Sequence, residues 1–372
     1  MKRMLIVFSV FTAFFVFSLP VNAENVYSEQ ESLWYEGLYD AVDSDTAKML
    51  SELGIEEIDP DALMNISPEK VFTLLFDIIT GRDDSPVAAT FSVLAVMIIS
   101  TLICTLLASG GQLKEMCETV GTFCIMFSVI LSVSSGLTES LSAVEATKDY
   151  MLCLLPVFCG VVAFSGNPSL ALSFNTVMLG FAETVSVGFS EYIPPLSAVG
   201  TALSASSVIN PFFDLSAVVK LINKGVTLVL SFVSAVFVAV LSIKGTIAGA
   251  ADTVGLKGLK FIVGNSVPVV GSAIGDALNT LSAGLGLIKN TAGIFCIIVL
   301  LIINVPSLLR LIIRKICLYF LSVCAGMLGN SKAEGFITAL NGLYSVIISV
   351  ISFNMFVFVI GIMIVLITGK GM

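Results

Sequence analysis

Long runs of apolar residues recur along the chain from about residue 87 to the C-terminus. Several approach the roughly 20 residues that an α-helix needs to cross the hydrocarbon core of a bilayer. The pattern predicts an all-α, polytopic membrane protein with about seven to nine transmembrane helices. The segments that fit are 87–108, 119–142, 150–165, 169–190, 225–243, 291–309, 316–330 and 345–368.

Two further segments, 195–217 and 257–290, do not fit this pattern. They are rich in glycine, serine and proline and are apolar on one face only. Each could form a short span, a re-entrant hairpin or an interfacial helix. Broken backbone at membrane depth is tolerated only where protein or water surrounds it.

The chain before the first of these runs divides into two parts. Lys2 and Arg3 precede an apolar run that ends near Phe17, and Val21 and Ala23 supply the small residues of a cleavage site. We therefore predict a signal peptide at 1–23, with an uncleaved first helix as the alternative. An acidic, helical, extracytoplasmic segment is expected at 24–86, and a multi-span transmembrane domain at 87–372.

Charge is scarce and unevenly distributed. Hydrophobic residues make up 56% of the chain and charged residues 12%, and the mean hydropathy is +1.02. Residues 24–86 carry 16 acidic and three basic side chains, a net −13, which leaves about +4 for the remainder. This asymmetry does not indicate nucleic-acid binding. Basic residues usually mark cytoplasmic loops, so Arg310, Arg314 and Lys315 are expected on the cytoplasmic side.

The composition excludes several kinds of chemistry. The chain has no histidine, which removes the usual proton shuttle and the commonest metal ligand. Its eight cysteines show no C-x-x-C spacing and are read as small apolar side chains. Gly275-Asp276 resembles part of an intramembrane aspartyl protease motif, but the sequence supplies no second aspartate for it. We therefore predict no enzyme, no metal and no cofactor.

The most informative segment is KFIVGNSVPVVGSAIGDALNTL, residues 260–281, in which a proline and glycines interrupt an apolar run. Beyond the proline, polar side chains recur at helical spacing on one face. This pattern favours a helix that lines a polar cavity or shapes a structural motif; a helix lying flat in the interface is the alternative. The candidate residues are Gly264, Pro268, Gly271, Ser272, Gly275, Asp276, Asn279 and, beyond the segment, Lys289.

Two other features bear on transport. Residues 194–204 echo residues 268–279, as expected of a transporter with internal repeats, although small residues make such echoes common. Glu183 lies within a predicted span, where an ionised carboxylate is costly unless partnered. It is therefore a candidate intramembrane carboxylate, unless the span ends early and Glu183 lies among the headgroups.

Residues 257–294, KGLKFIVGNSVPVVGSAIGDALNTLSAGLGLIKNTAGI, resemble the stage III sporulation protein AE family. The likeness rests on the K-F-[IV]-x-G-x-x-[VI]-P-V-V-G core at 260–271, on Asp276-Ala277, and on Lys289-Asn290 with Gly293. The leader, the polar exported segment and the multiple spans agree more loosely with the same family.

This resemblance implies a subunit of a sporulation-specific, secretion-like channel complex linking mother cell and forespore and required for spore development. The subunit would lie in the mother-cell membrane and face the forespore. Its partners would be the other membrane and ring-forming proteins of the complex and the lipid bilayer; the sequence does not give the oligomeric state. The alternatives are a secondary transporter that uses Glu183 or Asp276, and a purely structural membrane anchor.

Overall fold

The computed structural model describes residues 36–39, 42–56, 58, 63, 66–67, 69–71, 73–74, 76, 86–106, 111–209, 216–266 and 271–368. Within these helices it leaves out the side chains of 111–115, 186, 207–209, 216–218, 220, 259–266, 271–283 and 285. Described helices and turns contain no β-strand. The elements are α3 (Ser44–Leu53), α6 (Pro86–Leu106), α7 (Gly111–Phe164), α8 (Pro168–Ile209), α9 (Ser216–Ser266), α10 (Gly271–Met327) and α11 (Ser331–Thr368).

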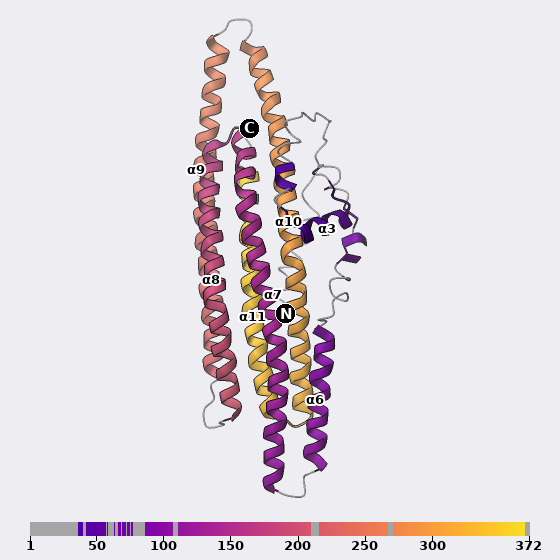
Figure 1. Ribbon diagram of the computed structural model, residues 1–372. Coiled ribbons are helices and arrows are strands. Elements are labelled where there is room, and N and C mark those ends of the chain that lie inside the picture. The colour runs from indigo at the N-terminus through magenta and orange to yellow at the C-terminus, as the bar shows by residue number, and fades with distance from the viewer. Residues whose placement is uncertain are drawn as a thin grey trace.

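Six of these helices, all but α3, are long and apolar enough to cross a membrane. The predicted all-α, polytopic membrane architecture is therefore confirmed. They lie side by side, alternately ascending and descending, in an elongated bundle (Figure 1). The short turns between them are closed by glycines in the left-handed region, Gly166 between α7 and α8 and Gly329 between α10 and α11. Only glycine adopts this conformation without a steric cost.

The helices are fewer and longer than the predicted seven to nine spans. Segments 119–142 and 150–165 both lie in α7, and 291–309 and 316–330 both lie in α10. Segment 169–190 continues through Pro194 and Pro195 into the ambiguous region as one helix, α8. An unbroken helix cannot turn back across a bilayer, so each pair of predicted segments counts as one span. Of the charged residues between these segments, Lys148, Arg310 and Arg314 are paired with residues of other helices, and the backbone remains helical.

Buried side chains form two clusters along the bundle. The lower tier joins α6 to one half of α7, α10 and α11, to the second half of α8 and to the start of α9; its members include Met97, Val129, Leu321 and Phe336. The upper tier joins the other halves of α7, α10 and α11 to the first half of α8. Its members include Phe158, Phe174, Phe295 and Phe358.

The acidic N-terminal segment packs on the upper tier. Asp43 caps α3 by accepting hydrogen bonds from the backbone N–H groups of residues 45 and 46. Leu50, Leu53 and Ile55 are buried in the upper cluster, and Tyr39 stacks on Phe295 of α10 with ring centroids 6.2 Å apart. The described part of this segment therefore docks on the protein's own helices.

Helix length sets the proportions of the molecule. The 21 residues of α6 rise about 31 Å, which matches the roughly 30 Å hydrocarbon core of a bilayer. The 57 residues of α10 rise about 85 Å, far more than one bilayer covers. The first turn of α6 lies beside Arg314, about three quarters of the way along α10. One bilayer can therefore enclose the lower tier or the upper tier, but not both.

The hairpin of α9 and α10 extends beyond every other helix (Figure 1). Its base is set by two glycines that lie against the end of α11, Gly249 beside Thr368 and Gly293 beside Leu366. Asp252 joins this base to α8, since its buried carboxylate accepts hydrogen bonds from the N–H groups of Ser169 and Leu170, at 3.1 and 2.9 Å. The carboxylate satisfies two of the N–H groups that the start of α8 leaves without helical partners.

We expect Asp252→Ala to lower the free energy of unfolding by about 1–3 kcal/mol, because it removes the acceptor and leaves buried donors unpaired. Asp252→Asn keeps one side-chain oxygen and should lose less. Thermal unfolding of the purified protein in detergent measures both. An alanine variant as stable as the parent would show that these two hydrogen bonds contribute nothing net.

Candidate functional site

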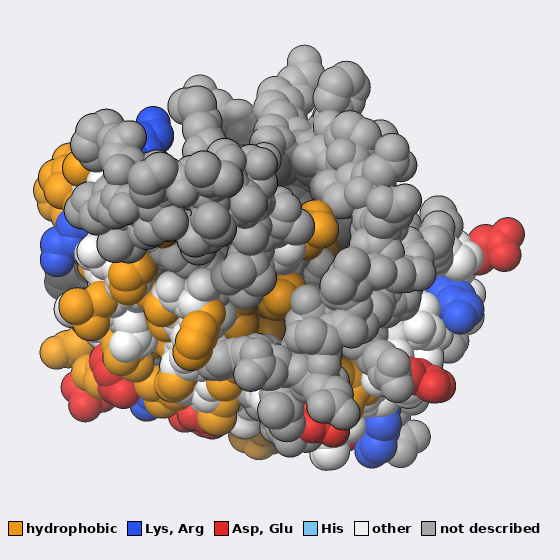
Figure 2. Space-filling view, turned by 90° about the horizontal axis from the view of Figure 1, so that it is seen from above, with side chains coloured by type: hydrophobic (Ala, Val, Ile, Leu, Met, Phe, Trp, Pro, Cys, Tyr) orange, Lys and Arg blue, Asp and Glu red, His pale blue; other side chains and the backbone are white. Residues whose placement is uncertain are grey.

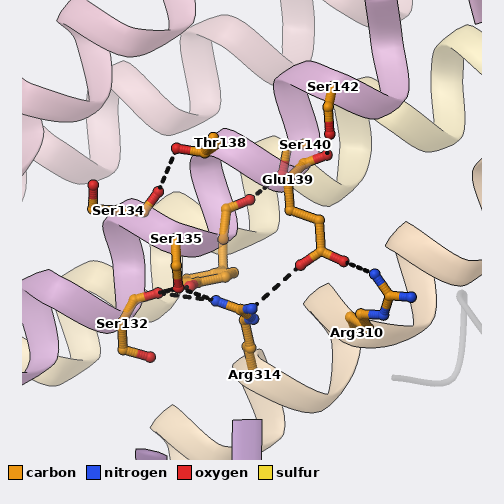
Figure 3. Close-up of polar contacts among 11 residues, drawn as sticks. Ser132, Ser134, Ser135, Thr138, Glu139, Ser140, Ser142, Arg310 and Arg314 are labelled. Atoms are coloured by element: carbon orange, nitrogen blue, oxygen red, sulfur yellow. Dashed lines mark hydrogen bonds and ion pairs between the residues drawn. The ribbon is translucent and has the colours of Figure 1, made fainter. Parts of the chain in front are cut away.

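A buried charged cluster joins α7 to α10 where the two tiers meet. Glu139 of α7 accepts a hydrogen bond from Arg310 at 2.6 Å and another from Arg314 at 3.3 Å, both on α10 (Figure 3). The three side chains are 15%, 14% and 8% exposed, respectively. Arg310 and Arg314 are four residues apart, so they lie on one face of the helix and reach the same carboxylate.

Arg314 also binds the backbone and side chains of α7. Its guanidinium donates to the carbonyl oxygen of Ser132 at 3.2 Å and to the hydroxyl of Ser135. Tyr344 of α11 donates to the same Ser132 carbonyl at 3.2 Å. Gly136 makes room for this tyrosine, since a β-carbon there would lie 2.5 Å from its hydroxyl oxygen. The cluster therefore connects three helices through one turn of α7.

The cluster carries two positive charges and one negative charge. The Nε atoms of Arg310 and Arg314 are buried and have no hydrogen-bond partner among the described residues. Separating such a network from water is costly, and removing one member leaves an uncompensated buried charge. A small cleft between α6, α7 and α10 lies beside it. Its lining includes Pro86, Thr90, Ser132, Arg314 and Cys317.

Two further polar contacts lie toward the upper tier. Thr147 of α7 and Asn304 of α10 are both buried, and their side chains hydrogen-bond to each other at 2.9 Å. Lys148 of α7 forms an ion pair with Glu183 of α8 at 3.8 Å. Together with the charged cluster, these contacts hold α7 in register with α8 and α10. They form an interhelical lock.

The predicted site residues are not brought together with this cluster. Glu183 has a side chain 55% exposed and is partnered by Lys148, so it is not an isolated buried carboxylate. Lys289 is 1% exposed, within the protruding part of α10. Pro268 lies outside the described residues. The other candidates lie in α9 or α10 where only the backbone is described, namely Gly264, Gly271, Ser272, Gly275, Asp276 and Asn279.

The arginines do not lie in a loop between two membrane spans, as the sequence analysis expected. They were expected in a cytoplasmic loop, but Arg310 and Arg314 lie inside α10 and are largely buried against Glu139. The rule that assigns basic residues to the cytoplasm applies to exposed loop residues, so it gives no orientation here. Glu139 was missed because it falls near the end of a predicted span. An acidic residue in one span and arginines four apart in another were the available signal for this pairing.

Among the side chains that the structure describes, no group of three or more cysteine, aspartate or glutamate residues could hold a metal ion. The cysteines within this part of the chain are free thiols.

Comparison with known proteins identifies the family. The model of the stage III sporulation protein AE family matches residues 60–369, which covers all of the long helices. The chain belongs to this family. The resemblance at residues 257–294 is thereby confirmed, and with it a role in sporulation for this membrane protein. The family description names a stage of spore development and no catalytic activity.

One curated member of the family is the stage III sporulation protein AE of Bacillus subtilis (strain 168). It is 25% identical over 245 residues, an alignment that covers 64% of this chain and 60% of the relative. The aligned part thus spans less than two thirds of the relative's length. No solved structure matches the chain.

We expect Glu139→Gln to destabilise this stage III sporulation protein AE family member strongly, by about 3–5 kcal/mol, because two buried guanidinium groups lose their counter-charge. Glu145→Gln changes an exposed carboxylate on the same helix and should have little effect. Folded yield after detergent extraction and unfolding temperature provide the measurement. Equal stability of the two variants would contradict a locking role for Glu139.

Proposed function

We propose that this protein is a membrane subunit of a sporulation-specific, secretion-like channel complex that links mother cell and forespore. The observation that carries the proposal, beside family membership, is the excess of apolar surface over what one bilayer can cover. A protein that worked alone would expose the remainder to water. A subunit of a larger assembly would bury it against neighbouring proteins.

The exposed apolar surface extends over both tiers. In the lower tier it includes Phe91, Ile99 and Leu102 of α6. In the upper tier it includes Phe232, Ile243 and Ile247 of α9. Seen from above, hydrophobic side chains also reach the surface on the side of α8 and α9 (Figure 2). This distribution supports contact with both lipid and protein partners.

The acidic segment supports a defined orientation for these contacts. In the proposal, residues 1–23 are the signal peptide, residues 24–86 face the space between mother cell and forespore, and residues 87–372 form the membrane domain. α3 buries Thr46, Leu50 and Leu53 and leaves Asp45 and Glu52 exposed, and Glu56, just beyond its end, is exposed too. The exposed carboxylates suit an extracytoplasmic partner with a basic surface, among the membrane and ring-forming proteins of the complex.

The protruding α9–α10 hairpin is the second proposed contact. It carries the segment 257–294 on which the family resemblance rests. Its candidate residues, from Gly264 to Lys289, would shape a polar path or a docking motif at the tip. Because the hairpin lies beyond the end of α11, it can reach partners that the rest of the bundle cannot.

We expect the triple variant Asp45→Lys, Glu52→Lys, Glu56→Lys to insert and fold normally, since the buried face of α3 is unchanged, but to lose partner binding and block spore formation. Lys48→Glu changes a neighbouring exposed residue and makes this surface more acidic, so the variant should retain function. Co-purification from sporulating cells and spore counts measure the effect. Normal sporulation in the triple variant would contradict a partner-binding role for these carboxylates.

A separate expectation concerns transport. In a non-enzymatic channel or scaffold subunit no carboxylate couples to a transported ion, so Asp276→Asn should leave spore counts unchanged. Bulk at the hairpin, as in Gly275→Leu, should impair them. Loss of sporulation in Asp276→Asn, with the complex still assembled, would instead favour a coupled transporter.

A further inference from the structure

One face of α9 packs on α8 and α11; the opposite face, which we call the bare face, is exposed among the residues that the structure describes. Leu241 and Ala248 are buried on the packed face, and Phe237 contacts the ring of Phe181 on α8 with centroids 4.1 Å apart. On the bare face, large apolar side chains are exposed from Leu221 to Val254. These 34 residues rise about 50 Å, more than a bilayer core covers.

The bare face has a coiled-coil repeat. Its members follow one another at alternating intervals of four and three residues, the spacing of positions a and d in a heptad. All are exposed, and those larger than alanine have between 38% and 71% of their surface accessible. All but the alanine are β-branched. We call this set the α9 seam: Val229, Val233, Val236, Val240, Ile243, Ile247, Ala250 and Val254.

The level of the α9 seam can be fixed from contacts across the bundle. Leu241 lies against Gly361 of α11, and Gly249 lies against Thr368 near the end of that helix. Leu366, close to that end, meets Gly293 of α10, which is two residues from Phe295, the residue on which Tyr39 stacks. The upper half of the α9 seam is therefore at the level of the N-terminal segment.

Lipid cannot cover this level. α3 displays charged side chains there, including Asp45 and Lys48, whose side chains are 79% and 74% exposed. Exposed charges of this kind require water. The bilayer must then enclose the lower tier, where α6 starts beside Arg314, 19 residues and about 28 Å along α10 from Phe295. A bilayer around α6 leaves most of the α9 seam beyond its hydrocarbon core.

We propose that the α9 seam binds the α9 seam of a second copy of this chain, as a parallel coiled coil outside the hydrocarbon core. Copies in one membrane share one orientation, so helices that meet side by side do so in parallel. A helix whose a and d positions all carry apolar side chains can pair with a second copy of itself. Each a or d side chain of one copy then enters a hole formed by residues of the same heptad repeat on the other copy. This inference needs only the chain itself and does not rest on the proposed channel function.

Site-specific disulfide formation tests the proposal. The full chain, with its eight native cysteines replaced, would carry one new cysteine at a time and be oxidised in membranes. Val240→Cys and Ile243→Cys should give a disulfide-linked dimer in several-fold higher yield than the controls. The controls are Ala235→Cys and Thr246→Cys, which are exposed on the same helix but lie off the α9 seam.

Three results would overturn it. Equal yields at seam and control positions would indicate random collision. If no dimer forms and maleimide labels the seam cysteine from water, the α9 seam is a free face. If no dimer forms and maleimide does not label the seam cysteine, lipid or another segment covers the α9 seam.

A charge variant provides a second measurement in the otherwise native chain. Val240→Lys with Ile243→Lys should reduce the mass of the detergent-solubilised protein to that of one copy, and the single chain should still fold because both side chains are exposed in it. Ala235→Lys with Thr246→Lys adds the same charge off the seam and should leave the mass unchanged. An unchanged mass in the seam variant would contradict self-association through α9.

Discussion

A bilayer provides about 30 Å of hydrocarbon, and the rest of this structure follows from how its helices compare with that distance. Only α6, with 21 residues, matches it. The helices α7 to α11 have 38 to 57 residues and are much longer than the hydrocarbon core is thick. An apolar side chain beyond the lipid must find another protein surface or remain in water at a cost. The fold is therefore that of a subunit, with a membrane tier and a tier that needs partners.

Long helices of this kind need internal polar contacts to hold their register. An apolar interface alone permits neighbouring helices to slide by a turn, since one leucine packs much like the next. The bridge from Glu139 to Arg310 and Arg314 has one satisfied geometry, and so does the pair of Thr147 with Asn304. Buried polar groups of this type are weak contributors to net stability, and their best-attested effect is on alignment. They lie between the two tiers, where a slip would displace both.

The sequence predicted the fold class, the membrane setting and the family, because each depends on patterns written in consecutive residues. Apolar runs of span length and the segment at 257–294 are such patterns. The continuity of α7 and α10 was not predictable in the same way. Arg310 and Arg314 look like a break when they are read alone, and their pairing with Glu139 across helices explains why α10 continues there. The contact of Tyr39 with Phe295 of α10 was also not predictable, because it joins residues more than 200 positions apart.

The base of the α9–α10 hairpin gives the molecule a mechanical property. Two helices of about 17 and 22 residues project past the contacts of Gly249 and Gly293 with α11. They form a rod that is clamped at one end. A force at its tip acts through an arm of about 25 Å, so a small load there becomes a large torque at the base. Asp252 transmits that torque to the start of α8, and the glycine contacts transmit it to the end of α11. Displacement of the tip is therefore coupled to the ends of two helices, α8 and α11, which run through the whole bundle.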